Sequence, residues 1–599
     1  MTRLAGAFFF MILLTTMTPA QNPTIDYQLS MSEPWTHYFE VEVTFSGLPA
    51  SEPSFELSMP AWRTGRYLIL DFAGGVVNFT ASDGNKKSLS WEKADKDTWR
   101  IAKGSSQSVK AIYKVYANEF SLRTRGLNDE GAFLDGASVF MYSEPHRNVP
   151  LTLTVVPYKN WHVTTGLDAV RGKRHTFSSP GYHHLADCPL FVGDQKDYEF
   201  EAEGKNHVLS ILGEGNYDAE KMIKDIKKLI TINKNFWGSI PYDRYVFMLH
   251  LWSAGSGGTE HVNSTIMGAR PFAFTNPNSY RGFLGLVSHE YFHTWNVKQI
   301  RPAGISPYNW AKENYTRELW IAEGTTSYYD QLLMVRGGMT SVERFIDQLP
   351  RRIEGERRKP GNRVQSAAES SFDAWVKYWK GHENSYNAES DYYDKGYDIS
   401  LMLDLEIRQR SKNKASLDDV MRAMYQRFPW DGNGYTLDDF QKLCGEFGGG
   451  SFRQFFDDFI FGTEPLEWET ALSYAGFEVI AKEKTEPWVG LFTREQDGRT
   501  AVRFVIAGSP AYKAGVSIGD ELIAFNGYRI RGTDLSARIA EMETGEKVRL
   551  TIIRNDRLRE FDVTLETDPV SSYTVTRIEE PTSLQKEIYE SWLGAKWEE

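Results

Sequence analysis

Apolar and polar residues alternate along several short runs in the first third of the chain, with the two-residue period of a strand that is buried on one face. The clearest runs lie at residues 37–45, 110–117 and 149–156. Turn signals such as Asp83-Gly84 separate the runs. The pattern therefore predicts a β-sandwich-like N-terminal domain over residues 21–205.

The hydrophobic period changes near residue 206. Residues 218–237 have apolar side chains at three- and four-residue spacing, as an amphipathic helix does. A strand candidate follows at residues 245–252, and from about residue 342 to residue 468 the pattern is mainly helical. These elements predict an α/β half followed by a helical half, together spanning residues 206–470.

A third pattern, of glycine turns between short apolar runs, begins after residue 470. Its motifs are Val489-Gly490-Leu491-Phe492, Gly508-Ser509-Pro510-Ala511 and Gly519-Asp520-Glu521-Leu522. They resemble a PDZ domain, which we predict over residues 471–570. Such a domain offers backbone N–H groups and a sheet edge to a peptide or protein C-terminus, although a purely structural role fits equally well. Residues 571–599 form a polar tail with one amphipathic helix candidate.

The segment His289-Glu290-Tyr291-Phe292-His293 carries the most specific chemistry. Side chains four apart lie on one face of a helix, so His289 and His293 can bind one zinc ion while Glu290 reaches the attacking water. The surrounding apolar residues have helical spacing, which indicates a largely buried helix. Two hydrogen-bonded core histidines beside a solvated glutamate are the alternative interpretation.

The third protein ligand must come from elsewhere, because a catalytic zinc keeps three protein ligands and one open position. Glu323 lies in an apolar helical stretch at residues 317–329 and is the favoured candidate. Glu318 and Glu313 remain alternatives, since spacing alone does not distinguish these carboxylates and either can cap a helix or lie in solvent.

Three further motifs carry a resemblance to known metallopeptidases. Residues 320–324, Trp-Ile-Ala-Glu-Gly, resemble the Trp-Leu-x-Glu-Gly element that supplies the carboxylate ligand in gluzincins, which favours Glu323. Residues 257–261, Gly-Gly-Thr-Glu-His, are similar to the Gly-x-Met-Glu-Asn motif of the aminopeptidase N family. Residues 393–396, Tyr-Asp-Lys-Gly, match that family's Tyr-x-Lys-Gly.

The departures from aminopeptidase N narrow the resemblance. His261 replaces the usual asparagine, the gap between His293 and Glu323 is longer, and a PDZ-like region follows. The combination resembles the glycyl aminopeptidase family of gluzincin zinc metallopeptidases with a C-terminal PDZ domain. This resemblance implies a multidomain α+β protein whose catalytic domain is thermolysin-like.

The resemblance also assigns roles to the central residues. His289, His293 and Glu323 would bind one zinc ion per chain. Glu290 would act as general base and then general acid. Tyr393 would donate its hydroxyl to the developing oxyanion, with Tyr392 as the alternative.

The glycine-rich motif is assigned to substrate binding. Glu260 would bind a free N-terminal ammonium, and Gly257 and Gly258 would let the substrate backbone approach closely. His261 is expected to bind substrate or to support a residue that does. A plain glycine turn with a surface glutamate is the alternative. Residues 62–67, Trp-Arg-Thr-Gly-Arg-Tyr, receive no chemistry and are expected to pack in the interior.

Composition and the N-terminal segment limit the cellular setting. The chain has 599 residues, a net charge of −12 and no sustained basic run, which argues against nucleic acid or an anionic membrane as partner. Arg3, the apolar residues 4–14 and the small residues ending at Ala20 predict a signal peptide, residues 1–20, without a stable membrane anchor. The product is then periplasmic or secreted, and we favour the periplasm because a glycan on Asn263 would obstruct the candidate site. The two cysteines are predicted to be buried free thiols.

The sequence thus predicts a zinc-dependent aminopeptidase that acts on peptides with a free N-terminus. A preference for glycine or alanine is implied by the resemblance alone. Two alternatives remain: a zinc endopeptidase whose substrates are recruited by the PDZ domain, and a catalytically silent peptide-binding protein.

Overall fold

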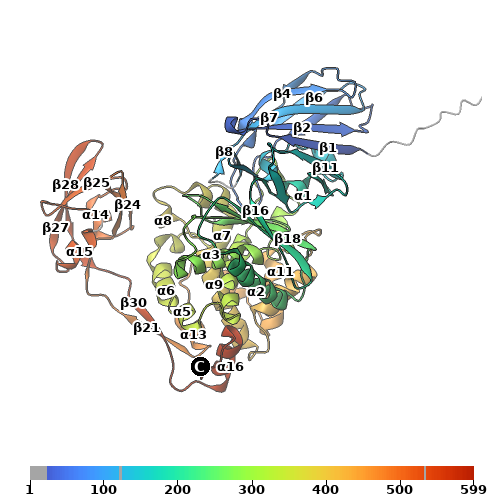
Figure 1. Ribbon diagram of the computed structural model, residues 1–599. Coiled ribbons are helices and arrows are strands. Elements are labelled where there is room, and N and C mark those ends of the chain that lie inside the picture. The colour runs from blue at the N-terminus through green and yellow to red at the C-terminus, as the bar shows by residue number, and fades with distance from the viewer. Residues whose placement is uncertain (1–22, 121–123, 532–533, 599) are drawn as a thin grey trace, which may run out of the picture.

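The computed structural model describes residues 23–120, 124–531 and 534–598. The predicted signal peptide lies outside these residues. A β-rich N-terminal domain sits at one end of the molecule, a mixed α/β and helical body forms the centre, and a small β-rich domain lies to the side (Figure 1). The predicted multidomain α+β class is confirmed. No described helix combines the length and the apolar character needed to cross a membrane.

The N-terminal domain is built on a seven-stranded sheet in the order β13-β14-β11-β1-β2-β7-β4. Its inward residues alternate as the sequence predicts: in β2, every second side chain is buried, from Phe39 to Phe45. The strand bounds are β1 Thr24–Ser30, β2 Tyr38–Ser46, β4 Val76–Ser82, β7 Ser108–Tyr116, β11 Leu151–Val156, β13 Asp168–Ala169 and β14 Thr176–Ser179.

Two smaller sheets complete this domain. One has three strands, β3 (Ser54–Ser58), β6 (Thr98–Ala102) and β5 (Trp91–Lys93). The other has five, in the order β12 (His162–Thr165), β15 (Leu190–Gly193), β10 (Gly131–Leu134), β9 (Arg125–Leu127) and β8 (Asn118–Glu119). A short helix, α1 (Tyr182–Ala186), precedes β15.

The central body begins with a five-stranded sheet, whose strands are β16 (Lys196–Ala202), β17 (Lys205–Leu212), β18 (Arg244–Leu251), β20 (Ser264–Ala269) and β19 (Gly258–Glu260). β17, β18 and β20 are parallel, and the helix α2 (Ala219–Trp237) makes the crossover between the first two. β19 runs antiparallel to β20 at the edge of this sheet.

The N-terminal domain and this central sheet share an apolar interface. Phe133 of β10 and Phe191 of β15 are buried in one cluster with Val208, Val246 and Met248 of the central sheet. Burial of this apolar surface fixes the N-terminal domain against the sheet that carries β19.

The helical half surrounds the helix α3 (Pro277–Phe292). Asn276 caps the start of α3 by accepting hydrogen bonds from the backbone N–H groups of residues 278 and 279, and Pro277 occupies the first turn. The other helices are α4 Thr326–Arg336, α5 Val342–Ile346, α6 Leu349–Arg358, α7 Ala367–Phe372, α8 Ser385–Ala388, α9 Asp394–Arg410, α10 Leu417–Arg427, α11 Leu437–Gly448, α12 Arg453–Phe459 and α13 Trp468–Ser473.

The small C-terminal domain has its own core and is reached through a ribbon of two strands, β21 (Phe477–Lys482) and β30 (Ser572–Arg577). Its sheet contains β23 (Leu491–Gln496), β24 (Arg499–Val505), β25 (Glu521–Phe525), β27 (Lys547–Arg554) and β28 (Arg557–Thr564) in this order, with β26 (Tyr528–Arg529) beside β25. The remaining elements are β22 Pro487–Trp488, β29 Glu566–Thr567, α14 Pro510–Ala514 and α15 Leu535–Ala540.

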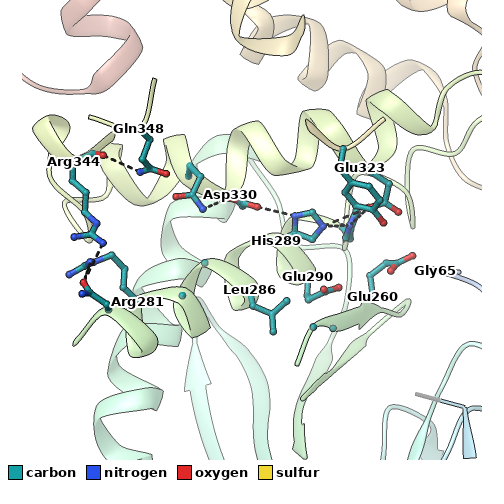
Figure 2. Close-up of a pocket in the computed structure, with 18 of the residues that line it drawn as sticks. Gly65, Glu260, Arg281, Leu286, His289, Glu290, Glu323, Asp330, Arg344 and Gln348 are labelled. Carbon is teal, nitrogen blue, oxygen red and sulfur yellow. Dashed lines mark hydrogen bonds and ion pairs between the residues drawn. The ribbon is translucent and has the colours of Figure 1, made fainter. Parts of the chain in front are cut away.

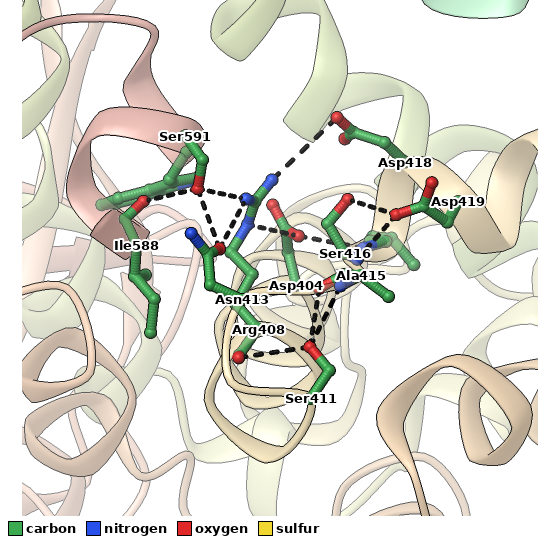
Figure 3. Close-up of polar contacts among 12 residues, drawn as sticks. Asp404, Arg408, Ser411, Asn413, Ala415, Ser416, Asp418, Asp419, Ile588 and Ser591 are labelled. Carbon is green, nitrogen blue, oxygen red and sulfur yellow. Dashed lines mark hydrogen bonds and ion pairs between the residues drawn. The ribbon is translucent and has the colours of Figure 1, made fainter. Parts of the chain in front are cut away.

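The chain then returns to the central body as the helix α16 (Ser583–Leu593). Arg408 donates a hydrogen bond to the Ser591 hydroxyl at 2.8 Å (Figure 3). The Asn413 side chain donates to the carbonyl of Glu587 at 2.9 Å. Trp592 is fully buried, and its indole N–H donates to the Tyr328 hydroxyl at 2.8 Å. The last helix is therefore part of the packing around α4 and α9.

Candidate active site

The last turn of α3 places the predicted histidines on one face. His289 and His293 lie one helical turn apart, and their Nε2 atoms are 3.1 Å from each other. Glu323 faces them from a neighbouring element, with Oε2 at 3.6 Å from His289 Nε2 and 3.2 Å from His293 Nε2. Figure 2 shows His289 and Glu323 pointing toward each other at the groove.

Glu323 is aimed at the histidines by an irregular helical turn. Trp320–Thr325 form one turn of π-helix that continues into α4. This turn lies so close to α9 that a Cβ on Gly324 would meet the Gly396 Cα at 2.4 Å. The Asn296 side chain donates to the carbonyl of Ile321 at 2.9 Å, which satisfies an acceptor that the widened turn leaves open.

Both imidazoles are oriented by acceptors at their other nitrogen. His289 Nδ1–H donates to Asp330 Oδ2 at 2.9 Å, and His293 Nδ1–H donates to the carbonyl of Asn296 at 2.7 Å. Each Nε2 therefore carries a lone pair that points toward the other ring and toward the Glu323 carboxylate. Two lone pairs and a carboxylate facing one point repel one another unless a cation lies between them.

The donor set fits zinc. Zinc bonds of roughly 2.0–2.2 Å in a tetrahedron place neighbouring donor atoms about 3.4 Å apart, close to the separations of 3.1, 3.2 and 3.6 Å found here. Burial alone would raise the pKa of Glu323, but the imidazoles of His293 and His289, when they carry a positive charge, lower it to about 2. Glu323 is then ionised.

Glu290 lies beside this set, with a carboxylate oxygen within 4.8 Å of the His293 imidazole. Its side chain is buried, and burial raises its pKa to about 7, with the negative charges of Glu260 and Glu323 adding to the effect and the two imidazoles opposing it. A Cβ on Gly258 would lie 2.4 Å from Glu290 Oε1, so only glycine lets β19 pass this close to the carboxylate.

Tyr393 and Tyr392 differ in what they face. Tyr393 lines the groove, its ring lies 6.4 Å from the His289 ring, and burial followed by the charge of Glu323 raises its pKa well above 10, so its hydroxyl stays protonated. Tyr392 is buried behind it, where its hydroxyl accepts a hydrogen bond from the Trp379 indole at 3.1 Å. Of the two, Tyr393 is the hydroxyl that lines the groove.

Glu260 stands at one end of the groove, close to the metal-binding set. Carboxylate and imidazole atoms of Glu260, Glu290 and His293 all lie within 4.8 Å of one another. Gly257, with φ of 67°, and Gly258 line the groove beside Glu260. His261 turns away from the groove: it is buried, with Nδ1 at 3.2 Å from Asp187 Oδ1.

A buried charge network supports Glu260 from the N-terminal domain. Asp187 accepts hydrogen bonds from Lys298 Nζ at 2.9 Å, from the Thr64 hydroxyl at 2.8 Å and from the backbone N–H of Val262 at 3.0 Å. Lys298 Nζ also lies 3.9 Å from Glu260 Oε1. The network links the domain interface to the end of the groove.

The loop at residues 62–67 reaches the same place. Gly65 lines the groove, and a Cβ there would lie 2.6 Å from Glu260 Oε2. From sequence, this loop was expected only to pack in the interior. The structure places its glycine in the lining of the groove beside Glu260, where a backbone φ of 71° and the short distance to the carboxylate both require the absence of a side chain.

The rival carboxylates have other partners. Glu318 accepts hydrogen bonds from the Thr316 hydroxyl and from the backbone N–H of Leu437 at 3.0 Å, so it joins two segments of the helical half. Glu313 is not in either cluster of the described residues that could hold a metal.

Asp330, which orients His289, was not predicted from sequence. It lies seven positions after Glu323, a spacing that returns to the same helix face.

Comparisons with known proteins agree with this arrangement. The Peptidase M61 N-terminal domain matches residues 26–194, the M61 glycyl aminopeptidase model matches residues 282–399, and a PDZ domain matches residues 487–565. The crystal structure of an aminopeptidase N family protein from Idiomarina loihiensis is similar over 95% of this chain and 100% of that one, with a TM-score of 0.88 and 28% sequence identity.

Two curated relatives match only in part. The periplasmic pH-dependent serine endoprotease DegQ of Escherichia coli (strain K12) is 40% identical over 75 residues, which are 12% of this chain and 16% of that protein. A probable periplasmic serine endoprotease DegP-like of Pseudomonas putida (strain W619) is 29% identical over 122 residues, 20% of this chain and 26% of that protein.

The matches to the M61 models follow the order of the domains in the chain, and the second spans the histidines, Glu323 and Tyr393. The similar crystal structure extends over nearly the whole length. The chain therefore belongs to the M61 glycyl aminopeptidase family of zinc metallopeptidases.

Proposed function

We propose that this chain removes the N-terminal residue of peptides, with a preference for small residues such as glycine or alanine, and that His289, His293 and Glu323 bind one zinc ion per chain. The observation that carries the proposal is the closed end of the groove. Glu260 lies there with 4% of its surface exposed, and Gly65 lies against its carboxylate. A peptide with further residues on the N-terminal side of the residue bound at Glu260 would collide with this loop.

Each side chain then has one task. When bound, zinc lowers the pKa of a water molecule to about 7 and polarises the scissile carbonyl. Glu260 accepts charge-assisted hydrogen bonds from the substrate ammonium, which fixes the first residue in place. Glu290 takes a proton from the attacking water on its carboxylate and delivers it to the leaving amine.

Tyr393 completes the reaction site. Its protonated hydroxyl donates a hydrogen bond to the carbonyl oxygen as negative charge develops there. Asp330 and the carbonyl of Asn296 hold the two imidazoles in the tautomer that leaves Nε2 available.

The test is hydrolysis of alanyl p-nitroanilide by the zinc-loaded protein, compared with its N-acetylated analogue. We expect turnover of the free amine only, and Glu290→Gln should lower kcat by at least about a thousandfold while leaving one zinc per chain. Equal turnover of the acetylated analogue would instead support a zinc endopeptidase. Zinc binding without turnover of any small-residue substrate would support a peptide-binding protein.

We further propose that the PDZ domain captures a peptide or protein C-terminus. Its strand β23 lies at the edge of the sheet, directly after the Val489-Gly490 turn, which is the arrangement that accepts an added strand. Binding of peptides with free and amidated C-termini, measured by fluorescence anisotropy on the full chain, tests this. Equal binding of both would contradict it.

The proposed setting is an exported one, with residues 1–20 removed as a signal peptide, and peptides rather than nucleic acid or a membrane as partners. N-terminal sequencing of the mature protein from cell fractions tests this. A first residue of Gln21 in the exported fraction is expected.

A further inference from the structure

The groove continues past the metal-binding residues along α3, in the direction away from Glu260. Its volume is about 830 Å³. Apart from Glu290, the lining residues on α3 and at its C-terminal end recur at three- and four-residue spacing, so one face of the helix forms the floor: Asn278, Arg281, Gly282, Gly285, Leu286, His289 and His293. Figure 2 shows Arg281, Arg344 and Gln348 at the opposite end of the groove from Glu260 and Gly65.

Two glycines on this floor have room for a side chain. A Cβ on Gly282 would meet nothing within 4 Å, and one on Gly285 would meet only the flexible end of Gln331 at 3.4 Å. Neither glycine has a positive φ. Glycine is among the least favourable residues inside a helix, so their positions under the groove are explained by the space they leave for a substrate backbone.

The far end of the groove is basic. Arg281 and Arg344 donate hydrogen bonds to the same Asn278 Oδ1, at 3.1 and 3.3 Å, and Arg351 also lines the groove. Among the described residues, none of these three arginines forms an ion pair with an acidic side chain. Two guanidinium groups that share one neutral acceptor repel each other, and an anion placed between them would relieve this repulsion.

The acidic side chains that line this part of the groove do not neutralise the three arginines. Asp347 lies on the same rim as Arg344 and Arg351. Asp330 is already engaged, since it accepts hydrogen bonds from His289 Nδ1–H and, at 2.7 Å, from Gln331. The groove thus has a carboxylate at one end and an excess of arginine at the other, which is the charge pattern complementary to a zwitterionic peptide.

The length of the groove sets the size of that peptide. Arg281 precedes His289 by eight positions on α3, which corresponds to about 12 Å at roughly 1.5 Å per helical residue. An extended peptide advances about 3.3–3.6 Å per residue, so three to four residues cover this distance.

We propose that the arginine rim binds a substrate carboxylate three to four residues after the scissile bond. This inference rests on the proposed aminopeptidase function and names its substrate class: short peptides of four or five residues, bound by the ammonium at Glu260 and by the carboxylate at Arg281 and Arg344. The carboxylate is the C-terminus or the side chain of an aspartate or glutamate at the same position.

The test compares alanine peptides of two to seven residues as free acids and as C-terminal amides. At four or five residues, kcat/KM of the acid should exceed that of the amide by about tenfold, because charge-assisted hydrogen bonds are lost in the amide. The ratio should fall at six and seven residues. An amidated pentapeptide ending in aspartate separates the two sources: recovery of the preference assigns it to any carboxylate at this position, and no recovery assigns it to the C-terminus.

Variants of the rim decide whether these arginines are responsible. Arg281→Gln combined with Arg344→Gln should raise KM for the acid to the value for the amide, with kcat unchanged. Lys224→Gln removes the same type of charge from the exposed face of α2, outside the groove, and should leave the preference intact. An acid-to-amide ratio that does not vary with length, or that survives the double variant, would overturn the inference, while turnover of the peptides themselves would still uphold the aminopeptidase. No turnover of any peptide would overturn both.

Discussion

The two ends of the groove are built differently. One end, which we call the amine end because the proposed function places the substrate ammonium there, is formed by Glu260. Glu260 is buried, Lys298 has no exposed side-chain surface, and Lys298 pairs with Asp187 of the N-terminal domain. At the arginine end, Arg344 and Arg351 are exposed, and Arg281 and Arg344 share a single side-chain acceptor. Glu260 is positioned by buried ion pairs between residues far apart in the sequence. The arginines lie on exposed surfaces and are positioned by a single shared hydrogen-bond acceptor.

The difference follows from the distance to the reaction. A group that fixes the first residue of a substrate must be placed accurately, because an error of about 1 Å next to the scissile bond costs roughly a hundredfold in rate. A carboxylate some 12 Å away, at about 1.5 Å per helical residue, needs only an attractive charge within reach. We therefore expect changes at the amine end to have the larger effects, on stability at Asp187 and on kcat/KM at Glu260 and Gly65, and changes at the arginine end to have small effects on KM alone.

Asp187→Asn should have the largest effect. It removes the partner of a fully buried ammonium, and breaking a buried ion pair costs about 3–5 kcal/mol in the free energy of unfolding. Urea denaturation measures it. The control is Glu446→Gln, at the exposed pair that Glu446 forms with Arg427 at 2.7 Å, where we expect a much smaller change because solvent screens the pair.

The effect of Asp187→Asn should depend on pH in one direction. Burial alone would raise the pKa of Asp187, but Lys298 and His261 hold it far below its ordinary value of 3.8. The stabilisation is therefore complete above about pH 4 and is lost as the pH falls further, so the difference between wild type and variant should shrink in acid. A difference that grows below pH 4 would contradict the ion pair.

Glu260→Gln should come second. Hydrogen bonds to charged groups contribute about 1.5–3 kcal/mol, so kcat/KM for alanyl p-nitroanilide should fall by roughly ten- to a hundredfold, mainly through KM. Lys298 keeps Asp187 as its partner, and stability should change little. Glu214→Gln, at an exposed pair with Lys196, provides the matched control. An unchanged KM would remove Glu260 from amine recognition.

The chemistry on α3 could be predicted from sequence because it is local. His289, Glu290 and His293 lie within one helical turn, and helical periodicity in the flanking apolar residues is enough to place them on one face. Glu323 needed more: it was the favoured candidate among three carboxylates, but the resemblance was needed to choose it over Glu318 and Glu313. The π-helical turn that aims it has no local signal, because it depends on the close approach of Gly324 and Gly396.

The residues that surround Glu260 could not be predicted from sequence, because their contacts are not local. Asp187 and Lys298 are 111 positions apart in the sequence, and Gly65 precedes Glu260 by 195. Their proximity comes from the packing of two domains, which no local pattern encodes. The same holds for α16: its amphipathic pattern was visible, but the burial of Trp592 against the central body is a tertiary contact.

Gly65→Ala should have the third largest effect, a decrease in kcat/KM. The added methyl group would lie 2.6 Å from both Glu260 Oε2 and Thr259 Cγ2, so the Glu260 carboxylate must move. We expect a loss of about tenfold in kcat/KM, seen as a higher KM. Gly172→Ala controls for backbone strain, because Gly172 also has a positive φ, of 78°, with nothing within 4 Å of the added atom. Equal kinetic effects in the two variants would refute the close approach to Glu260.

Gly282→Ala should have the smallest effect and the most informative sign. Alanine inside a helix is favoured over glycine by about 0.8–1 kcal/mol, and the site offers open space, so the variant should be more stable than the wild type. The methyl group would stand on the floor of the groove, and KM for a five-residue alanine peptide should rise about threefold, the effect of a single misplaced contact. Alanyl p-nitroanilide, which does not reach this part of the groove, should be unaffected.

Gly355→Ala on α6 is the control. Its surroundings are equally open but it does not line the groove, so it should stabilise the protein by a similar amount without changing KM for either substrate. If both variants gain stability and neither changes KM, Gly282 has no role in binding, and the floor of α3 is not a path for the substrate.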